Sequence, residues 1–164
     1  MATIGVVLSN AMGRDASVDI RKATEKDGRA VADVYLASFK ATYEFPLAHT
    51  DDEVRSWIAA VLLCASETWV AEQAGRVIGF VSLGEETIDQ LYVAPRHTGH
   101  GIGSRFVTLA KQRRPHRLSL WTFQANGRAR RFYERHGFRV AETTDGSGNE
   151  ERQPDVRYIW PLTY

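Results

Sequence analysis

Apolar and polar positions alternate along the chain in a way that predicts strands and helices in turn from residue 17 onward. Residues 17–23 (SVDIRKA) alternate with a period of two, which is typical of a half-buried strand. Residues 24–43 carry apolar side chains at helical spacing, and Thr24 is a capping residue at their start. The Thr-Asp-Asp-Glu sequence at 50–53 matches a capping box and predicts a second helix that continues through Leu62.

The period returns to two after the second predicted helix. Residues 68–83 (TWVAEQAGRVIGFVSL) predict two strands joined by a short turn at 73–76. Residues 86–95 (ETIDQLYVAP) predict a third strand. Three strands in succession indicate an antiparallel meander.

The second half of the chain continues the alternation. After Pro95 the pattern predicts a helix at about 101–113, a strand at 117–123, a helix at 126–137 and strands at 138–144 and 154–162. The fold class that we predict is therefore α/β, with a mixed, mostly antiparallel twisted sheet of about seven strands flanked by about four helices.

The composition is typical of a globular protein and agrees with the predicted fold class. The chain has 164 residues, 43% apolar and 25% charged, which is typical of one compact domain. No apolar run is long enough to span a membrane and no basic leader precedes the first apolar run, so we expect a cytoplasmic protein without a membrane partner. Residues 1–16 lack useful periodicity and are predicted to be a flexible leader, with the domain at 17–164.

The single cysteine, Cys64, excludes an internal disulfide. Its apolar setting (AAVLLCASE) suggests a small buried residue and not an activated nucleophile.

Charge is divided unevenly along the chain although the net charge is only +1. Residues 96–139 hold 11 Lys and Arg residues against one acid, whereas residues 1–95 carry a net charge of −6. This division suggests an anionic ligand near the basic segment. Basic helices also often face only water, so the division of charge alone does not show whether an anionic ligand binds there.

Three glycines, Gly99, Gly101 and Gly103, stand on alternate positions where the third predicted strand of the meander gives way to a helix. The first N–H groups of a helix have no intrahelical acceptor and lie at the positive end of its dipole. Glycine removes the Cβ that would keep an anion away and permits unusual φ angles, so the loop predicts a pyrophosphate site. A flexible loop with turn glycines is the alternative.

The glycine-containing loop does not match either of two well-known phosphate-binding motifs. The dinucleotide-binding fingerprint requires a glycine where the chain has Ser104, and a P-loop requires Lys followed by Ser or Thr at the helix start.

Two segments together, 91–103 (LYVAPRHTGHGIG) and 126–138 (NGRARRFYERHGF), closely resemble the GNAT superfamily of N-acetyltransferases. The family's motif is Arg or Gln, two residues, Gly, any residue, and Gly or Ala, which here falls on Arg96, Gly99 and Gly101. The resemblance implies a single GNAT-like domain that uses acetyl-CoA as co-substrate and no metal.

The resemblance also implies where acetyl-CoA binds. Its pyrophosphate would lie on the amides of 98–104, and its pantetheine arm would run along the strand before them, with Asn126 holding the arm. The implied cofactor residues are Leu91, Tyr92, Val93, Arg96, Thr98, Gly99, His100, Gly101, Ile102, Gly103, Ser104 and Asn126.

Tyr133 is the predicted acid that protonates the departing thiolate, because it lies two helical turns after Asn126 on the same face. The alternative is that Tyr133 is only a core aromatic residue. Many relatives have a Glu at the start of the central strand, where this chain has Thr87. Glu86 is the predicted base, acting through a water, and a solvated surface charge is its alternative.

The acceptor is predicted to be a small-molecule or peptide amine, and analogy with the family suggests Phe39 and Tyr43 as its contacts. The competing hypothesis is that the domain binds an acyl-CoA as a sensor and catalyses nothing. A homodimer is possible by analogy, because the terminal strands of this family commonly join subunits. A nucleic-acid partner is not expected, because the aromatic residues of the basic segment have core-like spacing and form no exposed stacking row.

Overall fold

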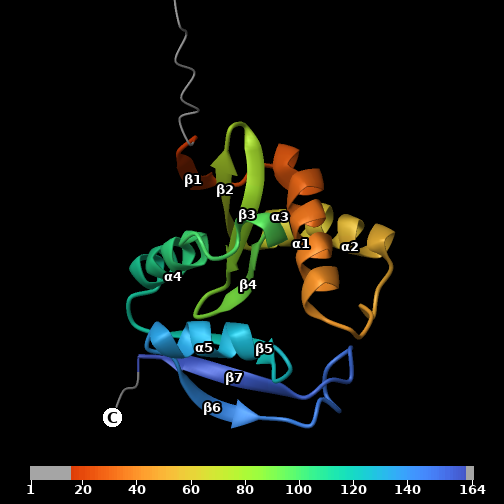
Figure 1. Ribbon diagram of the computed structural model, residues 1–164, viewed down its shortest axis with the longest axis vertical. Helices are drawn as coiled ribbons and strands as arrows, with labels where there is room; N and C mark the ends of the chain where they lie inside the picture. The colour runs from red at the N-terminus through yellow and green to blue at the C-terminus, as the bar shows by residue number, and fades with distance from the viewer. Residues whose placement is uncertain (1–15, 162–164) are drawn as a thin grey trace, which may run out of the picture.

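The computed structural model describes residues 16–161, which form two antiparallel sheets with helices packed on them (Figure 1). The first sheet has the order β1-β2-β3-β4, and the second has the order β5-β7-β6. The strands are β1 (Val18–Lys22), β2 (Glu67–Gln73), β3 (Arg76–Leu83), β4 (Ile88–Val93), β5 (Leu118–Phe123), β6 (Arg139–Thr143) and β7 (Asp155–Trp160).

The helices follow the predicted order. The chain forms α1 (Gly28–Thr42), α2 (Asp51–Trp57), α3 (Leu63–Ala65), α4 (Ile102–Arg113) and α5 (Gly127–Arg135). Short 3-10 turns, η1 (Glu25–Asp27) and η3 (Pro95–His97), precede α1 and α4. The predicted α/β class and the meander β2-β3-β4 are confirmed. The predicted leader at 1–16 lies outside the described residues, apart from Ala16.

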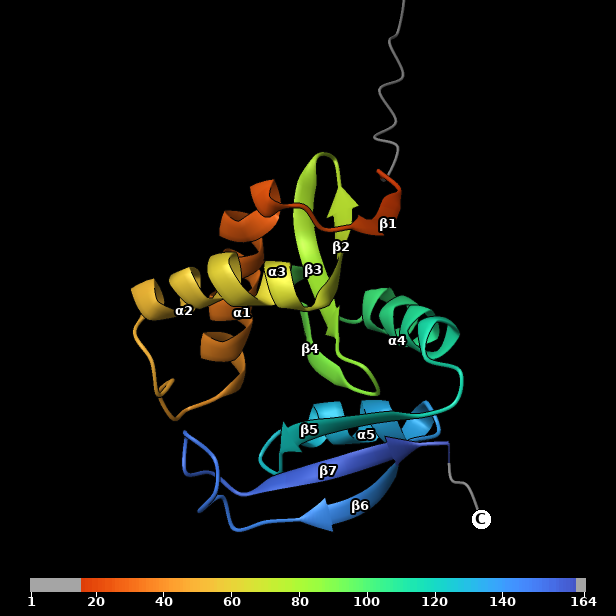
Figure 2. The same cartoon turned by 180° about the vertical axis from the view of Figure 1, so that it is seen from behind.

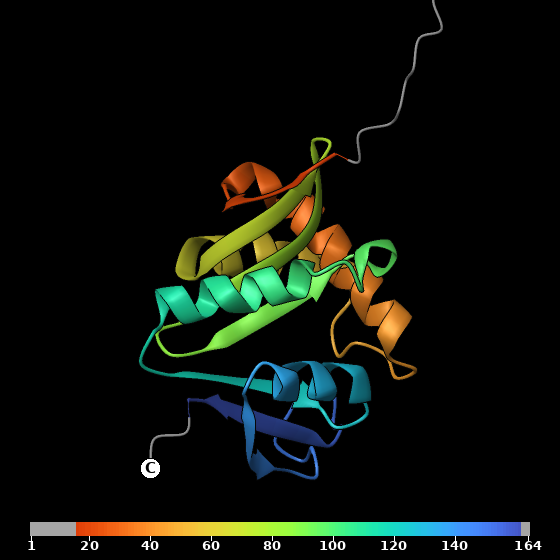
Figure 3. The same cartoon turned by 60° about the vertical axis from the view of Figure 1, so that its left-hand side comes forward.

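Helices cover both faces of the first sheet (Figure 3). On one face, α1 and the segment after α2 bury Val31, Ile58 and Leu62 against Val70 and Phe80 of the sheet. On the other face, α4 packs against β3 and β4. No helix of the described residues is long and apolar enough to cross a membrane.

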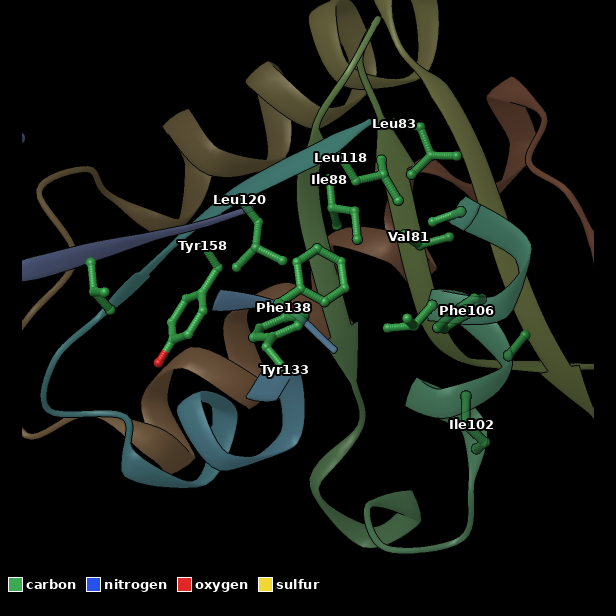
Figure 4. Packing of buried hydrophobic residues seen from close by; sticks show 14 of the residues in the cluster. Val81, Leu83, Ile88, Ile102, Phe106, Leu118, Leu120, Tyr133, Phe138 and Tyr158 are labelled. Atoms are coloured by element: carbon green, nitrogen blue, oxygen red, sulfur yellow. The ribbon is translucent and has the colours of Figure 1, made fainter. Parts of the chain in front are cut away.

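The second core cluster joins α4 and α5 to both sheets (Figure 4). Phe106 of α4 and Phe138 after α5 are both 0% exposed. Tyr133 and Tyr158 belong to the same cluster and their ring centroids lie 6.3 Å apart. The two sheets therefore share one apolar interior although they are separate ladders.

Capping side chains fix the helix starts that the sequence predicts. Thr50 Oγ1 accepts a hydrogen bond from Glu53 N–H over 3.3 Å, and a Glu53 carboxylate oxygen accepts from Thr50 N–H over 2.7 Å. This reciprocal pair is the predicted capping box. Asp27 in turn accepts from Thr24 N–H over 2.8 Å and binds the guanidinium of Arg21.

The segment after Trp57 differs from the prediction in two ways. The helix changes to a π-helical turn, η2 (Ile58–Leu62), before α3. The prediction that Cys64 is buried is wrong, because its side chain is exposed. Ile58 and Leu62 face the core, whereas Cys64, two residues after Leu62, lies about 200° further around the helix and faces outward.

Strands β4 and β5 come together at one end and diverge at the other. An isolated parallel bridge pairs Thr87 with Ser119, and Ser119 N–H donates to the Glu86 carbonyl over 2.8 Å. Beyond this bridge each strand belongs to a different sheet, as Figure 2 shows from behind. A cleft opens between them.

Candidate active site

The cleft between the two sheets has a volume of about 1210 Å³. Strands β4 and β5 form two of its walls, α5 and the start of α4 border it, and the end of α1 and the β6–β7 loop reach it. A cleft of this size, built at the junction of two sheets, is typical of a site for a sizeable small molecule.

The N-terminus of α4 presents free backbone donors to this cleft. The first intrahelical hydrogen bond runs from Arg105 N–H to the Gly101 carbonyl over 3.1 Å. The N–H groups of Ile102, Gly103 and Ser104 therefore have no acceptor in a preceding turn. All three residues line the cleft, so the helix dipole and these donors favour an anion there.

Two of the three glycines have the backbone conformation that the loop requires. Gly99 and Gly101 have φ angles of 81° and 84°, a left-handed region that L side chains rarely adopt. A β-carbon built at Gly101 would meet no atom of residues 16–161 within 4 Å. Space beside Gly101 is thus open, and the strain of a left-handed residue, not crowding, requires glycine at this position.

Gly103 is glycine for a different reason from the one expected. It lies inside α4, and a β-carbon there would come within 3.2 Å of Phe132 Cζ. The third glycine therefore permits close packing of α4 against α5. It does not provide an unusual φ angle.

The open edge of β4 also carries backbone polar groups. Ala94 N–H donates to the Ile78 carbonyl of β3 over 2.8 Å. Because N–H groups alternate along a strand, those of Leu91 and Val93 point to the opposite edge, toward β5. Ser38 Oγ of α1 donates to the Val93 carbonyl over 2.8 Å, which ties this edge to the first helix.

Tyr133 reaches the cleft from α5 with only 7% of its surface exposed. No hydrogen bond to its hydroxyl is formed by the described residues. Burial, and then the nearby Tyr43, raise the pKa of Tyr133 well above its usual 10. The hydroxyl is therefore neutral and keeps its proton available to a group in the cleft.

Asn126 caps α5 and connects it to α1. Its Oδ1 accepts from Ala129 N–H over 3.0 Å, and its Nδ2 donates to Tyr43 Oη over 3.0 Å. Asn126, Tyr133 and Tyr43 all line the cleft. The structure brings these three predicted residues together with others from the strand and loop that also line the cleft, namely Leu91, Tyr92, Val93, Thr98, Gly99, Gly101, Ile102, Gly103 and Ser104.

Three predicted binding residues lie elsewhere. Phe39 is 2% exposed and packs in the core beneath Tyr43, with ring centroids 4.7 Å apart. Arg96 and His100 are exposed and are not part of the cleft wall, although His100 belongs to the loop. The side chains of these residues do not meet the predicted site.

The carboxylates near the central strand divide between the cleft and the surface. Glu86 Oε2 lies 3.9 Å from Arg117 Nε, and its side chain is 59% exposed, outside the cleft wall. Asp89 lines the cleft and accepts from Thr87 Oγ1 over 2.5 Å. Glu86 as the base stays a prediction, and a water chain would have to connect it to the cleft.

Glu151 on the β6–β7 loop adds negative charge near Tyr43 at one end of the cleft, since burial and, to a smaller extent, the charge of Glu151 raise the pKa of Tyr43. Burial, and then the negative charge of Glu151, raise the pKa of Tyr35 to about 12. His49 Nε2 lies 2.8 Å from Glu150 Oε2, and this contact raises the pKa of His49. This end of the cleft therefore favours a cation over an anion.

The β6–β7 loop forms a wall of the cleft that the sequence does not predict. Ser147, Gly148 and Asn149 line the cleft together with Asp155 at the start of β7. Asn149 Nδ2 donates to an Asp155 carboxylate oxygen over 3.0 Å, which folds the loop back on the strand. Polar and glycine-rich loops of this kind occur on many surfaces, so the sequence offered no signal to find it.

Known proteins of one family are similar to this chain in sequence. Residues 65–140 match the family model described as Acetyltransferase (GNAT) domain. The peptidyl-lysine N-acetyltransferase YiaC of Escherichia coli is 30% identical over 145 residues, which cover 87% of this chain and 97% of that protein.

Solved structures share the fold. The solution structure of apo-form YjaB from Escherichia coli superposes with a TM-score of 0.74 and 23% identity, covering 90% of this chain and 99% of that one. The PaiA N-acetyltransferase of Thermoplasma acidophilum, in complex with coenzyme A, superposes with a TM-score of 0.67 and 24% identity, covering 87% and 98%.

Proposed function

The chain belongs to the GNAT family of acetyltransferases, and from this premise we propose that it transfers the acetyl group of acetyl-CoA to a primary amine. We propose direct attack by the amine while both substrates are bound, without a covalent intermediate on the enzyme. Lysine side chains of peptides or proteins are the proposed acceptor class, since the relative YiaC is named for that activity.

The observation that carries the proposal is the position of the α4 N-terminus at the cleft. Three free N–H groups and the left-handed Gly101, with open space beside it, fit a diphosphate in chemistry and in room. Arg128 adds a cation, because its Nη2 lies 3.7 Å from the β-carbon position of Gly99. These groups would hold the diphosphate of acetyl-CoA.

Bound acetyl-CoA supplies an activated thioester. The open edge of β4 would pair with the amides of the pantetheine arm, and a Leu91 or Val93 N–H would donate to the thioester oxygen as negative charge develops on it. Tyr133 would donate its hydroxyl proton to the departing sulfur, since its raised pKa keeps it protonated.

The acceptor would enter at the end of the cleft near Tyr43. Glu151 on the β6–β7 loop adds negative charge at this end, which attracts an ammonium group. The amine must lose a proton before it attacks, and Glu86 stays the predicted acceptor of that proton through water. Cys64 has no part in this scheme.

The experiment that tests the proposal is an amine panel with acetyl-CoA, in which free thiol is the readout. We expect lysine-containing peptides to raise thiol release well above hydrolysis, with acetylated lysine in the product by mass spectrometry. Release that no amine raises would contradict the proposal and favour an acyl-CoA sensor. Thiol release that only small polyamines or amino acids raise would support acetyltransferase activity but contradict the proposal that lysine side chains are the acceptors.

A further inference from the structure

His136, at the end of α5, contacts the first turn of α4. Its Nε2 lies 3.0 Å from Ser104 Oγ. Ser104 lines the cleft and also carries one of the three free N–H groups of α4. The imidazole therefore lies directly behind a residue that has both a backbone and a side-chain donor at the anion site.

Packing fixes the imidazole in this place. The ring of Phe132 lies 4.5 Å from that of His136, centroid to centroid, and Phe132 itself packs against Gly103. Lys111 Nζ donates to the His136 carbonyl, which ties the end of α5 to α4. The missing side chain at Gly103 lets the helices approach closely enough for the contact between His136 and Ser104.

We propose that His136 is a positioning residue that directs the Ser104 hydroxyl proton toward the diphosphate of acetyl-CoA. The inference rests on the proposed function. A hydroxyl has one proton and two lone pairs. When Nε2–H of His136 donates to Ser104 Oγ, the hydroxyl proton is free to point into the cleft. In the opposite arrangement, the Ser104 hydroxyl would donate its proton to Nε2 of His136. Only the lone pairs of the hydroxyl oxygen would then face the diphosphate, which they would repel.

The arrangement requires a proton on Nε2 of His136, which the cationic ring always carries and the neutral ring carries in one of its two tautomers. Burial, followed by the positive charges of Lys111 and Arg135, lowers the pKa of His136. The neutral ring is therefore favoured, and a diphosphate that accepts the Ser104 hydroxyl proton would select the tautomer with the proton on Nε2.

A double-mutant cycle on CoA binding, measured by isothermal titration calorimetry, tests the inference. His136→Met fills the space without a donor, and Ser104→Ala removes the hydroxyl. We expect each single variant to bind CoA roughly tenfold more weakly, by the usual strength of a hydrogen bond to a charged group. The double variant should bind no more weakly than Ser104→Ala alone, because His136 acts through Ser104.

His136→Gln is the matched control, because its amide nitrogen can take the place of Nε2. It should bind CoA within about twofold of the wild type, since it retains a donor. If His136→Met weakens binding equally when Ser104→Ala is already present, or if the Gln variant binds as weakly as the Met variant, the inference is overturned and His136 only packs the helices. Absence of CoA binding by the wild type would instead overturn the proposed function.

Discussion

Asn126 Nδ2 donates a hydrogen bond to Tyr43 Oη over 3.0 Å and thereby joins the helix on the cofactor side of the cleft to the helix on the acceptor side. The same side chain caps α5 through its Oδ1. One residue thus stabilises the helix that carries Tyr133 and also fixes a wall of the acceptor end.

Two substitutions at Asn126 separate these roles. Asn126→Ala should lower the free energy of unfolding by about 1 kcal/mol, because α5 loses its N-cap, whereas Asn126→Ser should retain most of that stability. Both variants lose the donor to Tyr43, and both should raise the KM for the amine about three- to tenfold. Urea unfolding and steady-state kinetics measure the two effects. A Ser variant with normal KM would show that the Tyr43 contact does not matter for the acceptor.

Gly101→Glu should abolish cofactor binding through both charge and backbone strain. Acetyl-CoA at about a hundred times its Kd should stabilise the wild type by about 2.7 kcal/mol, which corresponds to a Tm rise of about 5 to 10 °C. In the variant the rise should be under about 1 °C, because a carboxylate at the loop repels the diphosphate.

Gly75→Glu is the control for Gly101→Glu. Gly75 has a φ angle of 75° and, like Gly101, no atom of the described part of the chain within 4 Å of its β-carbon position, but it lies in the β2–β3 turn. The Gly75→Glu variant introduces the same backbone strain and the same charge as Gly101→Glu, but at a position outside the cleft. A loss of the cofactor shift in both variants would contradict the assignment of the α4 N-terminus.

Tyr133→Phe should lower kcat about a hundredfold, the lower end for loss of a general acid, and leave the Kd for CoA unchanged. The Tm of the Tyr133→Phe variant should equal that of the wild type, because the Tyr133 hydroxyl has no hydrogen bond within the described residues. The raised pKa of Tyr133 keeps the phenol protonated above pH 10, so ionisation of this residue should cause no fall in kcat between pH 7 and 10.

Tyr158→Phe is the matched comparison for Tyr133. The Tyr158 hydroxyl donates to Glu134 Oε1 over 2.8 Å, so its loss should lower the Tm while kcat changes little. An unchanged kcat in Tyr133→Phe would remove the residue from the mechanism and leave it as a core aromatic.

Asp27→Asn should destabilise the fold in a way that depends on pH. The hydrogen bond from Arg21 is the largest cause that lowers the pKa of Asp27 below its usual 3.8. A carboxyl with a lower pKa in the folded state contributes stability above its unfolded pKa and loses it as the pH falls through the folded value. The variant should lose about 1 to 3 kcal/mol at pH 7, and the difference should shrink below pH 4.

Urea unfolding of both proteins at pH 7 and pH 3.5 measures this difference. Asp33→Asn removes an exposed ion pair with Arg55 and should change stability by less than about 1 kcal/mol at either pH. A difference for Asp27→Asn that is equal at both pH values would show that its charge does not stabilise the fold.

The sequence predicted features that depend on neighbouring residues. The capping box at Thr50 and the turn at Gly75 are local, and so is the change of period after residue 67. The loop of Gly99 and Gly101 was predicted because a strand, a loop and a helix start follow one another directly along the chain. The spacing that places Asn126 and Tyr133 on one helical face was predicted in the same way.

Features that depend on packing between distant segments could not be predicted. The divergence of β4 from β5 comes from their membership of different sheets, and it decides that Asp89 lines the cleft while Glu86 does not. The π-helical turn at Ile58–Leu62 could not be predicted either, because no apolar pattern reveals such a turn. The contact that requires Gly103 is with Phe132, 29 positions away in the sequence.

A crystal structure of the protein with bound CoA would show whether the N-terminus of α4 holds the diphosphate. We predict diphosphate oxygens within hydrogen-bond distance of the N–H groups of Ile102, Gly103 and Ser104, with the CoA sulfur near the Tyr133 hydroxyl. A nucleotide bound away from the α4 N-terminus, with these N–H groups facing no phosphate, would contradict this prediction.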